Sequence, residues 1–224
     1  MAAVVSVNVG MPRLVDFETT SLPQTAIEKH PVDGPVRITA LGVEGNACGD
    51  TVHHGDELMR VYAYSVEDYR WWEEELGAPL RPAHFAEQLT TEGVDLNAAV
   101  VGETWRVGSG LLQISHVRTP CLTFKGWMGH TGHDATAWVR RFALAGRPGP
   151  YFRVLEEGVV TAGDTIDVVD RPDHGVTVGT LFRGLMVDPA LLAPLVDVEG
   201  LKDWVHDRAR LAAGRGSRPA YEPE

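Results

Sequence analysis

The sequence predicts a mainly β body with at least one inserted helix, followed by a small subdomain of three helices. In the first 170 residues, short runs of β-branched and aromatic residues alternate with Gly, Pro, Asn and Asp. Strands that are short and often interrupted by turns are typical of a barrel or a curled sheet. Beyond residue 176, apolar residues recur instead at the spacing of amphipathic helices.

Six stretches have the composition of strands, and turn residues separate them. We expect strands at residues 4–9, 35–43, 60–65, 104–117, 151–160 and 164–170. Runs this short favour a barrel or a curled sheet over a doubly wound α/β domain. Residues 1–175 are therefore expected to form one β-barrel domain.

The one helix expected within this body spans residues 65–77. Ser65 can cap its first turn, and Gly77 is a natural residue at its C-terminal end. Its apolar residues fall on one face, which should be buried: Tyr69, Trp72 and Leu76.

Residues 176–215 are expected to form the helical subdomain. Asp188 followed by Pro189 is a typical helix start. The polar residues of the last helix are interpreted as its solvated face: Lys202, Asp203 and Asp207. Residues 216–224 are expected to be a disordered tail.

Composition limits the class of function. A net charge of −11 disfavours binding to nucleic acid or to an anionic membrane. No secretory signal and no membrane-spanning apolar run are recognised, and the two cysteines, Cys48 and Cys121, are too few for a disulfide framework, so a cytoplasmic protein is expected. The signatures of P-loops, Rossmann domains, serine hydrolases and zincins do not occur. A small-molecule substrate is the expected partner.

Cys121 is the first candidate site residue. Pro120 fixes the backbone just before it, so the thiol follows the strand of residues 104–117 in a rigid position. Arg118 is close in sequence and would favour the thiolate, the nucleophilic and metal-binding form. Free cysteine is also often a small buried apolar residue, so both interpretations stay open on these grounds.

Three further segments carry polar residues suited to a site. His54 and Gly55 would present an imidazole beside an accessible backbone, or form a simple surface turn. Residues 84–93 offer hydrogen-bonding groups of a site, or the solvated face of a turn. Those groups belong to Glu87, Gln88, Thr90 and Thr91. His130 and His133 have a metal-ligand spacing, but the glycines around them favour a flexible loop.

Taken in order, these segments resemble the MOSC domain family, named for the C-terminal domain of molybdenum-cofactor sulfurase, and within it the stand-alone bacterial YiiM-like branch. The resemblance spans about residues 4–210 and implies a MOSC-type β-barrel with a three-helix tail. It rests on "TAI" at 25–27, "PVDGPV" at 31–36, "GVEGNACGDTVHHGDELMRVYAY" at 42–64, "FAEQLTTEG" at 85–93, "VRTPC" at 117–121 and "GPYFRVLEEGVVTAGD" at 149–164.

The resemblance implies that Cys121 binds molybdenum or carries sulfur. A soft thiolate suits a metal that the dithiolene sulfurs of a pterin already hold. The phosphate of this cofactor would need cations, for which Lys29, Arg37 and Arg118 are the candidates. His54 or Glu87 would donate a proton. The remaining residues expected at the cofactor are Gly55, Gln88 and Thr90.

The sequence departs from the family pattern in the segment expected beside the ligand. Asp56 replaces a glycine and adds a repelling charge, while Leu58 and Met59 replace an Asp-Lys pair, so a lysine is missing. The other departures are Asn46 for Asp, Ala86 for Gly and Gln88 for Asn. Alanine accepts a positive φ poorly at position 86. These changes indicate an altered use of substrate or cofactor.

The leading hypothesis is an oxidoreductase that binds the molybdenum cofactor through Cys121 and reduces an N-hydroxylated or other N–O substrate. Its electrons would come from a separate redox partner protein. One alternative is a cofactor-independent cysteine enzyme or sulfur carrier in a specialised biosynthetic reaction. Another is a non-catalytic carrier of the cofactor. A homodimer is compatible with all three.

Overall fold

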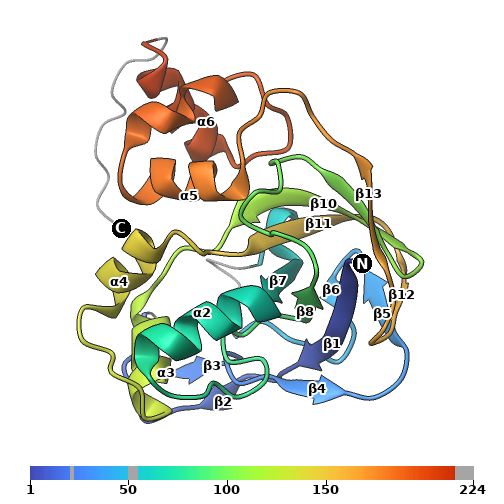
Figure 1. Cartoon of the computed structure of the whole chain (residues 1–224), viewed down its shortest axis with the longest axis vertical. Coiled ribbons are helices and arrows are strands. Elements are labelled where there is room, and N and C mark those ends of the chain that lie inside the picture. The colour runs from blue at the N-terminus through green and yellow to red at the C-terminus, as the bar shows by residue number, and fades with distance from the viewer. Residues whose placement is uncertain (21–22, 50–54, 215–224) are drawn as a thin grey trace.

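The computed structural model of the chain describes residues 1–20, 23–49 and 55–214 (Figure 1). Its main feature is an eight-stranded sheet. The strands follow one another in the order β13 (Ile166–Asp170), β9 (Thr104–Val107), β10 (Gly110–Val117), β11 (Pro150–Glu156), β7 (Val61–Ser65), β8 (Leu89–Glu92), β1 (Ala3–Val9) and β4 (His30–Val32). Neighbours run antiparallel, except that β7 and β8 are parallel.

Two smaller sheets complete the β structure. One has the order β12 (Gly158–Val160), β5 (Val36–Thr39) and β6 (Gly42–Val43), and the other pairs β2 (Arg13–Leu14) with β3 (Gln24–Thr25). The helices are η1 (Glu57–Met59), α2 (Val66–Leu76), α3 (Leu122–His130), α4 (Trp138–Ala145), α5 (Val178–Met186), η2 (Pro189–Leu195) and α6 (Asp203–Ala212). The prediction of a mainly β fold with inserted and C-terminal helices is confirmed.

The large sheet curls so that β1 lies next to the residues just before β13. Its continuous ladder is open, with β13 and β4 at the two ends. An isolated bridge nevertheless joins Ala3 to Thr165, and the Val4 amide donates to the Asp164 carbonyl at 2.9 Å. The sheet is therefore strongly curved, and the ladder between its named strands does not close into a barrel.

The helix predicted at residues 65–77 is confirmed with its caps. The Ser65 hydroxyl accepts the Asp68 amide at 3.1 Å, and Gly77 ends α2 with φ 65°, a left-handed conformation that favours glycine. The face predicted to be apolar is turned inward, with Tyr69 and Trp72 buried. Here the sequence pattern agrees with the structure because capping and amphipathicity are local properties.

Two further α-helices in the body, α3 and α4, were not predicted. Gly126 and Gly129 lower the helix propensity of α3, and α4 starts at Ala137 in a left-handed conformation (φ 49°) without a side-chain cap. Their stability comes from tertiary packing. Trp72 of α2 stacks on Phe142 of α4, with ring centroids 5.8 Å apart, and Phe124 of α3 packs edge-on against the same ring.

The C-terminal helices lie together at one end of the molecule, at the top of Figure 1. The cap predicted at Asp188 is confirmed, since its carboxylate accepts the Ala190 amide at 3.1 Å, but the segment that follows is a 3₁₀ helix. The prediction that Lys202 is solvated is wrong: its side chain is only 14% exposed and lies 2.6 Å from the Asp56 carboxylate. Residues 216–224 lie outside the described residues.

Candidate functional site

Cys121 lies at the junction between the large sheet and α3. It follows β10, has an extended backbone (φ −134°, ψ 175°) and is the N-cap residue of α3. Its carbonyl accepts the Lys125 amide at 3.0 Å, while its side chain makes no capping bond. The thiol is half-buried, at the positive end of the helix dipole. The same residue also packs against the hydrophobic core, so both interpretations of Cys121 stay open in the structure.

Arg118 is buried beside this thiol. Its guanidinium lies over the rings of Phe124 (4.5 Å to the centroid) and Tyr62 (5.2 Å), and Nη1 donates to the Phe85 carbonyl at 2.9 Å. Its Nε has no hydrogen-bond partner among the described residues. A buried cation with a spare donor can bind an anionic ligand that enters the site.

The Arg118 backbone is fixed by a close approach of two chain segments. Its amide donates to the Gly149 carbonyl at 3.3 Å. A Cβ at Gly149, where φ is 69°, would lie only 2.4 Å from the Ala63 carbonyl oxygen. Glycine at this position therefore allows the segment after β10, which carries Arg118, to be anchored.

Glu87 is completely buried, and only one of its oxygens is satisfied. Its Oε1 accepts hydrogen bonds from the Tyr69 and Thr90 hydroxyls, both at 2.8 Å. Its Oε2 has no partner among the described residues. Burial raises the pKa of Glu87 to about 7, although the bonds from Thr90 and Tyr69 and the nearby charge of Arg118 oppose this shift. The carboxyl group can therefore give or take a proton near neutral pH.

Lys29 supplies a second buried cation. Its ammonium donates to the Ala26 carbonyl at 3.1 Å and to the side-chain oxygen of Asn46 at 2.5 Å. Burial, and after it the charge of Arg118, lowers the pKa of Lys29 to about 8. The group is still mainly charged at neutral pH. Asn46 holds it without neutralising it, which gives the departure at that position a physical meaning.

Cys48 belongs to the same region, although sequence reasoning did not include it. Burial raises the pKa of the Tyr151 phenol, and the two cysteines, Cys121 and Cys48, add to this shift while Arg118 opposes it. Cys48 also lies close enough to Lys29 to oppose the lowering of the Lys29 pKa. Cys48 is exposed. Its place two residues after Asn46, in a segment that carries the resemblance, was the only signal in the sequence.

Three of the residues predicted to contact the cofactor make contacts with other residues of the protein: Arg37, Gln88 and Thr90. The exposed Arg37 on β5 lies 4.0 Å from Glu157, and no contact joins it to the buried cations in the described chain. The side-chain oxygen of Gln88 accepts the backbone amide of Tyr62 at 2.9 Å, which ties β8 to β7. Thr90 bonds to Glu87 and so positions that carboxyl group.

The segment around Gly55 is only partly described, because His54 lies outside the described residues. Asp56 caps η1 by accepting the Leu58 amide at 2.9 Å. Met59 is buried in the core, where a charged lysine would be costly. Asp56 was expected to be a repelling charge, but Lys202 pairs with it.

The histidine pair outside this region does not form a metal site with other ligands. His130 lies 3.4 Å from Asp16, while the ring of His133 packs edge-on against buried His84 at 5.0 Å. Burial, with the charges of His133 and Arg81, lowers the pKa of His84 to about 3. In the described ranges no three His, Cys, Asp or Glu side chains gather as metal ligands.

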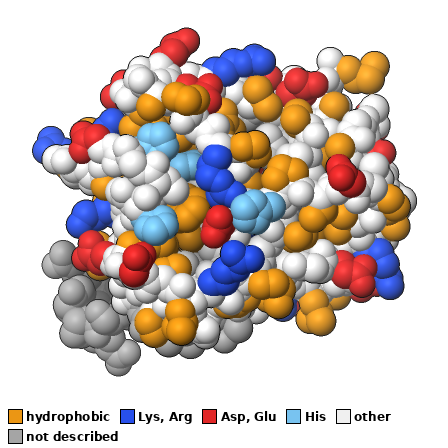
Figure 2. Space-filling model, turned by 90° about the horizontal axis from the view of Figure 1, so that it is seen from below, with side chains coloured by type: hydrophobic (Ala, Val, Ile, Leu, Met, Phe, Trp, Pro, Cys, Tyr) orange, Lys and Arg blue, Asp and Glu red, His pale blue; other side chains and the backbone are white. Residues whose placement is uncertain are grey.

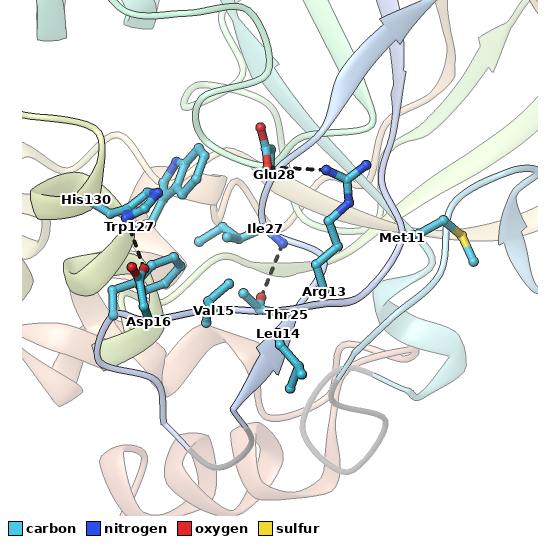
Figure 3. Close-up of a pocket in the computed structure, with 11 residues that line it drawn as sticks. Met11, Arg13, Leu14, Val15, Asp16, Thr25, Ile27, Glu28, Trp127 and His130 are labelled. Carbon is cyan, nitrogen blue, oxygen red and sulfur yellow. Dashed lines mark hydrogen bonds and ion pairs between the residues drawn. The ribbon is translucent and has the colours of Figure 1, made fainter.

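A cavity of about 510 Å³ lies between the β2–β3 hairpin and α3 (Figure 3). Ile27 and Trp127 contribute apolar surface, and the charged residues on its walls are paired, Arg13 with Glu28 and His130 with Asp16.

The molecule seen from below carries histidine and charged side chains among hydrophobic ones (Figure 2). No helix of the described chain is long and apolar enough to cross a membrane.

Comparison with known proteins is consistent with this fold. The MOSC domain family matches residues 50–167. The chain is 32% identical over 176 residues to the uncharacterized protein YflK of Bacillus subtilis, covering 79% of this chain and 77% of YflK. It is 28% identical over 151 residues to YiiM of Escherichia coli, covering 66% of this chain and 65% of YiiM.

A more distant relative and a solved structure extend the comparison. The chain is 31% identical over 157 residues to a protein of Gibberella moniliformis named "Reductase", covering 66% of this chain but only 26% of that protein. The crystal structure of YiiM from Geobacillus stearothermophilus superposes with a TM-score of 0.75 at 24% identity, over 95% of this chain and 99% of that one. The chain belongs to the MOSC domain family.

Proposed function

We propose that this protein binds the molybdenum cofactor with Cys121 as a metal ligand and reduces N-hydroxylated or other N–O substrates, with electrons from a separate redox protein. The observation that carries the proposal is the convergence of four groups on one region. They are the half-buried thiol of Cys121, the buried cations of Arg118 and Lys29, and the buried carboxyl group of Glu87.

The charges present fit an anionic ligand with donor groups of its own. The chain as a whole carries a net charge of −11, yet Lys29 and Arg118 are both buried cations. Burying a charge is costly unless a partner compensates it, and a phosphate-bearing ligand would do so. Glu87 Oε2 and Arg118 Nε, both without partners among the described residues, could then pair with a ring N–H and an anionic oxygen.

Each residue has a role that its chemistry supports. The soft sulfur of Cys121 would hold the metal, and the cofactor, when bound, supplies the two-electron chemistry there. Reduction of an N-hydroxyl group to an amine and water also consumes two protons. Glu87 can supply a proton, because its pKa of about 7 keeps a large share of the carboxyl groups protonated at neutral pH.

The comparisons support this proposal only in general terms. The family takes its name from a protein of the molybdenum cofactor pathway, and the relative from Gibberella moniliformis is named a reductase. This chain covers about a quarter of that relative, so the reducing activity of the relative could reside elsewhere in it. The assignment therefore depends on the chemistry of the site.

The test is to produce the protein in a host that makes the cofactor, and to measure molybdenum by elemental analysis and turnover of an N-hydroxylated substrate with a chemical electron donor. The wild type should carry molybdenum and be active. Cys121→Ser should lose turnover and most of the metal, whereas Cys48→Ser, the matched thiol variant, should keep the metal. A wild type that is free of molybdenum, or an active Cys121→Ser variant, would refute the proposal.

The proximity of two cysteines to Tyr151 favours one second candidate, a cofactor-independent cysteine enzyme or sulfur carrier. Cys121 would then carry the reacting sulfur. A protein without molybdenum that accepts a persulfide sulfur on Cys121, detected as a mass increase of one sulfur atom, would support this candidate instead.

A further inference from the structure

The C-terminal subdomain makes an ion pair with the segment Gly55–Met59, which the family resemblance associates with the ligand. Lys202, at the start of α6, places its ammonium 2.6 Å from the Asp56 carboxylate. The side chains are 14% and 46% exposed, respectively, so the lysine is mostly enclosed while the carboxylate faces partly toward solvent. A partly enclosed pair is less screened than one on an open surface.

Asp56 organises the rest of its segment. It caps η1 through the Leu58 amide at 2.9 Å, and the Leu58 carbonyl accepts the Ser115 hydroxyl at 2.6 Å. The same hydroxyl lies 3.3 Å from the Tyr151 carbonyl. Ser115 and Tyr151 belong to β10 and β11, and β10 leads directly into Arg118 and Cys121. The hydrogen bonds thus connect Asp56 to the strands that carry the candidate site.

A second contact joins the subdomain to the same strand. Trp204, two residues after Lys202, packs edge-on against the ring of buried His116, with centroids 5.5 Å apart. His116 is the neighbour of Ser115 on β10. Gly200 brings the subdomain close to β11 as well, because a Cβ at this position would lie only 3.2 Å from the Arg153 guanidinium. The start of α6 therefore rests on both strands that hold the segment of Asp56.

We propose that Lys202 is a positioning residue of the site. It holds the segment Gly55–Met59 against β10 and neutralises Asp56, so that an anionic ligand meets no unpaired carboxylate there. The family pattern has a lysine at the position of Met59. In this chain a cation reaches the segment from the C-terminal subdomain instead. The ligand in this inference rests on the proposed function, whereas the anchoring of the segment does not.

The experiment compares Lys202→Met, Asp56→Asn, the double variant Asp56→Asn/Lys202→Met, and Lys202→Arg. Arg210→Met is the control, since it removes an exposed ion pair, with Asp207, from the same helix. Two quantities are measured: hydrogen exchange of the backbone amides of Leu58–Arg60, and molybdenum content after expression in a cofactor-producing host.

Lys202→Met should speed exchange at these amides about fivefold, the effect of losing a pair worth about 1 kcal/mol. In Lys202→Arg, which keeps the positive charge, exchange at these amides should stay as slow as in the wild type. Molybdenum content should fall in Lys202→Met and recover in the double variant, in which no carboxylate is left unpaired. If the fall were caused only by lost stability, the second substitution would not restore the molybdenum content. Arg210→Met should change neither quantity.

Unchanged exchange in Lys202→Met would overturn the anchoring role. A double variant as poor in molybdenum as Lys202→Met would overturn the neutralising role. If the wild type itself contains no molybdenum, the proposed function fails, and the exchange rates alone still decide whether Lys202 positions the segment.

Discussion

The Lys29 ammonium lies 2.5 Å from the side-chain oxygen of Asn46, an amide where the family pattern has an aspartate. An amide accepts the hydrogen bond but leaves the positive charge in place. A carboxylate at the same position would form an ion pair and use that charge internally. Under the proposed function, the departure at Asn46 would leave the charge of Lys29 available to an anionic ligand.

This relationship predicts the effect of Asn46→Asp. The pKa of Lys29, about 8 in the wild type, should rise, because a neighbouring carboxylate stabilises the charged form. At neutral pH the affinity for an anionic ligand should fall about tenfold, since the cation is already paired. NMR titration of the lysine checks the first effect and molybdenum content the second.

Asn46→Ala is the matched control, because it removes the hydrogen bond without adding a charge. It should leave anion affinity closer to the wild type than Asn46→Asp does. Equal affinities for wild type and Asn46→Asp would show that Lys29 does not face the ligand.

Glu87 predicts a specific dependence of stability on pH. Its pKa is about 7 in the folded protein and about 4.5 when unfolded, so the folded state binds the proton more tightly. Its contribution to stability is therefore complete below about pH 4.5 and is lost as the pH rises through 7. Between pH 5 and 8 the free energy of unfolding of the wild type should fall by about 2.5 kcal/mol relative to Glu87→Gln.

Urea denaturation at the two pH values measures this difference. Glu92→Gln, at an exposed position on β8, the strand that follows Glu87, should follow the wild type. A Glu87→Gln protein with the same pH profile as the wild type would mean that the carboxyl group has an ordinary pKa.

His84 predicts the opposite behaviour on the acid side. Its pKa is lowered to about 3 by burial, so the folded state takes up a proton less readily than the unfolded chain, whose histidine titrates near 6.5. Stability from this group is present above pH 6.5 and decreases as the pH falls toward 3. Between pH 7 and 5 the free energy of unfolding of His84→Phe should fall by about 2 kcal/mol less than that of the wild type, as measured by urea denaturation. An identical loss in both proteins would contradict the buried, neutral state of His84.

The sequence predicted those features that depend on neighbouring residues. Ser65 and Gly77 define α2 by their capping chemistry, and the alternation of apolar residues located most strands. The segment with Glu87 stayed open between a solvated turn and a site. Its burial depends on aromatic residues of other elements, such as Tyr64 of β7, on which Phe85 of this segment stacks. A dense polar sequence alone cannot indicate that it is enclosed.

Long-range relationships were beyond the sequence pattern. Asp56 was expected to be an unpaired repelling charge because its partner, Lys202, is distant in the chain. Cys48 was not selected because only the fold brings it near Tyr151 and Lys29. The predicted roles of Cys121, Arg118, Lys29 and Glu87 at the cofactor remain predictions, although the fold provides a common region for them.

The last prediction concerns Ala86, next to Glu87. Its φ of 61° is in the left-handed region, where the family pattern has glycine and where alanine is strained by about 1 kcal/mol or more. Ala86→Gly relieves this strain but gives the unfolded chain more freedom, so a net gain of about 0.5 kcal/mol in the free energy of unfolding is expected. Ala143→Gly, the same change within α4, should instead cost about 1 kcal/mol. Urea denaturation of both variants is the measurement. If both substitutions destabilise the protein to the same extent, the backbone at Ala86 is not strained, and the family's glycine at this position has another purpose.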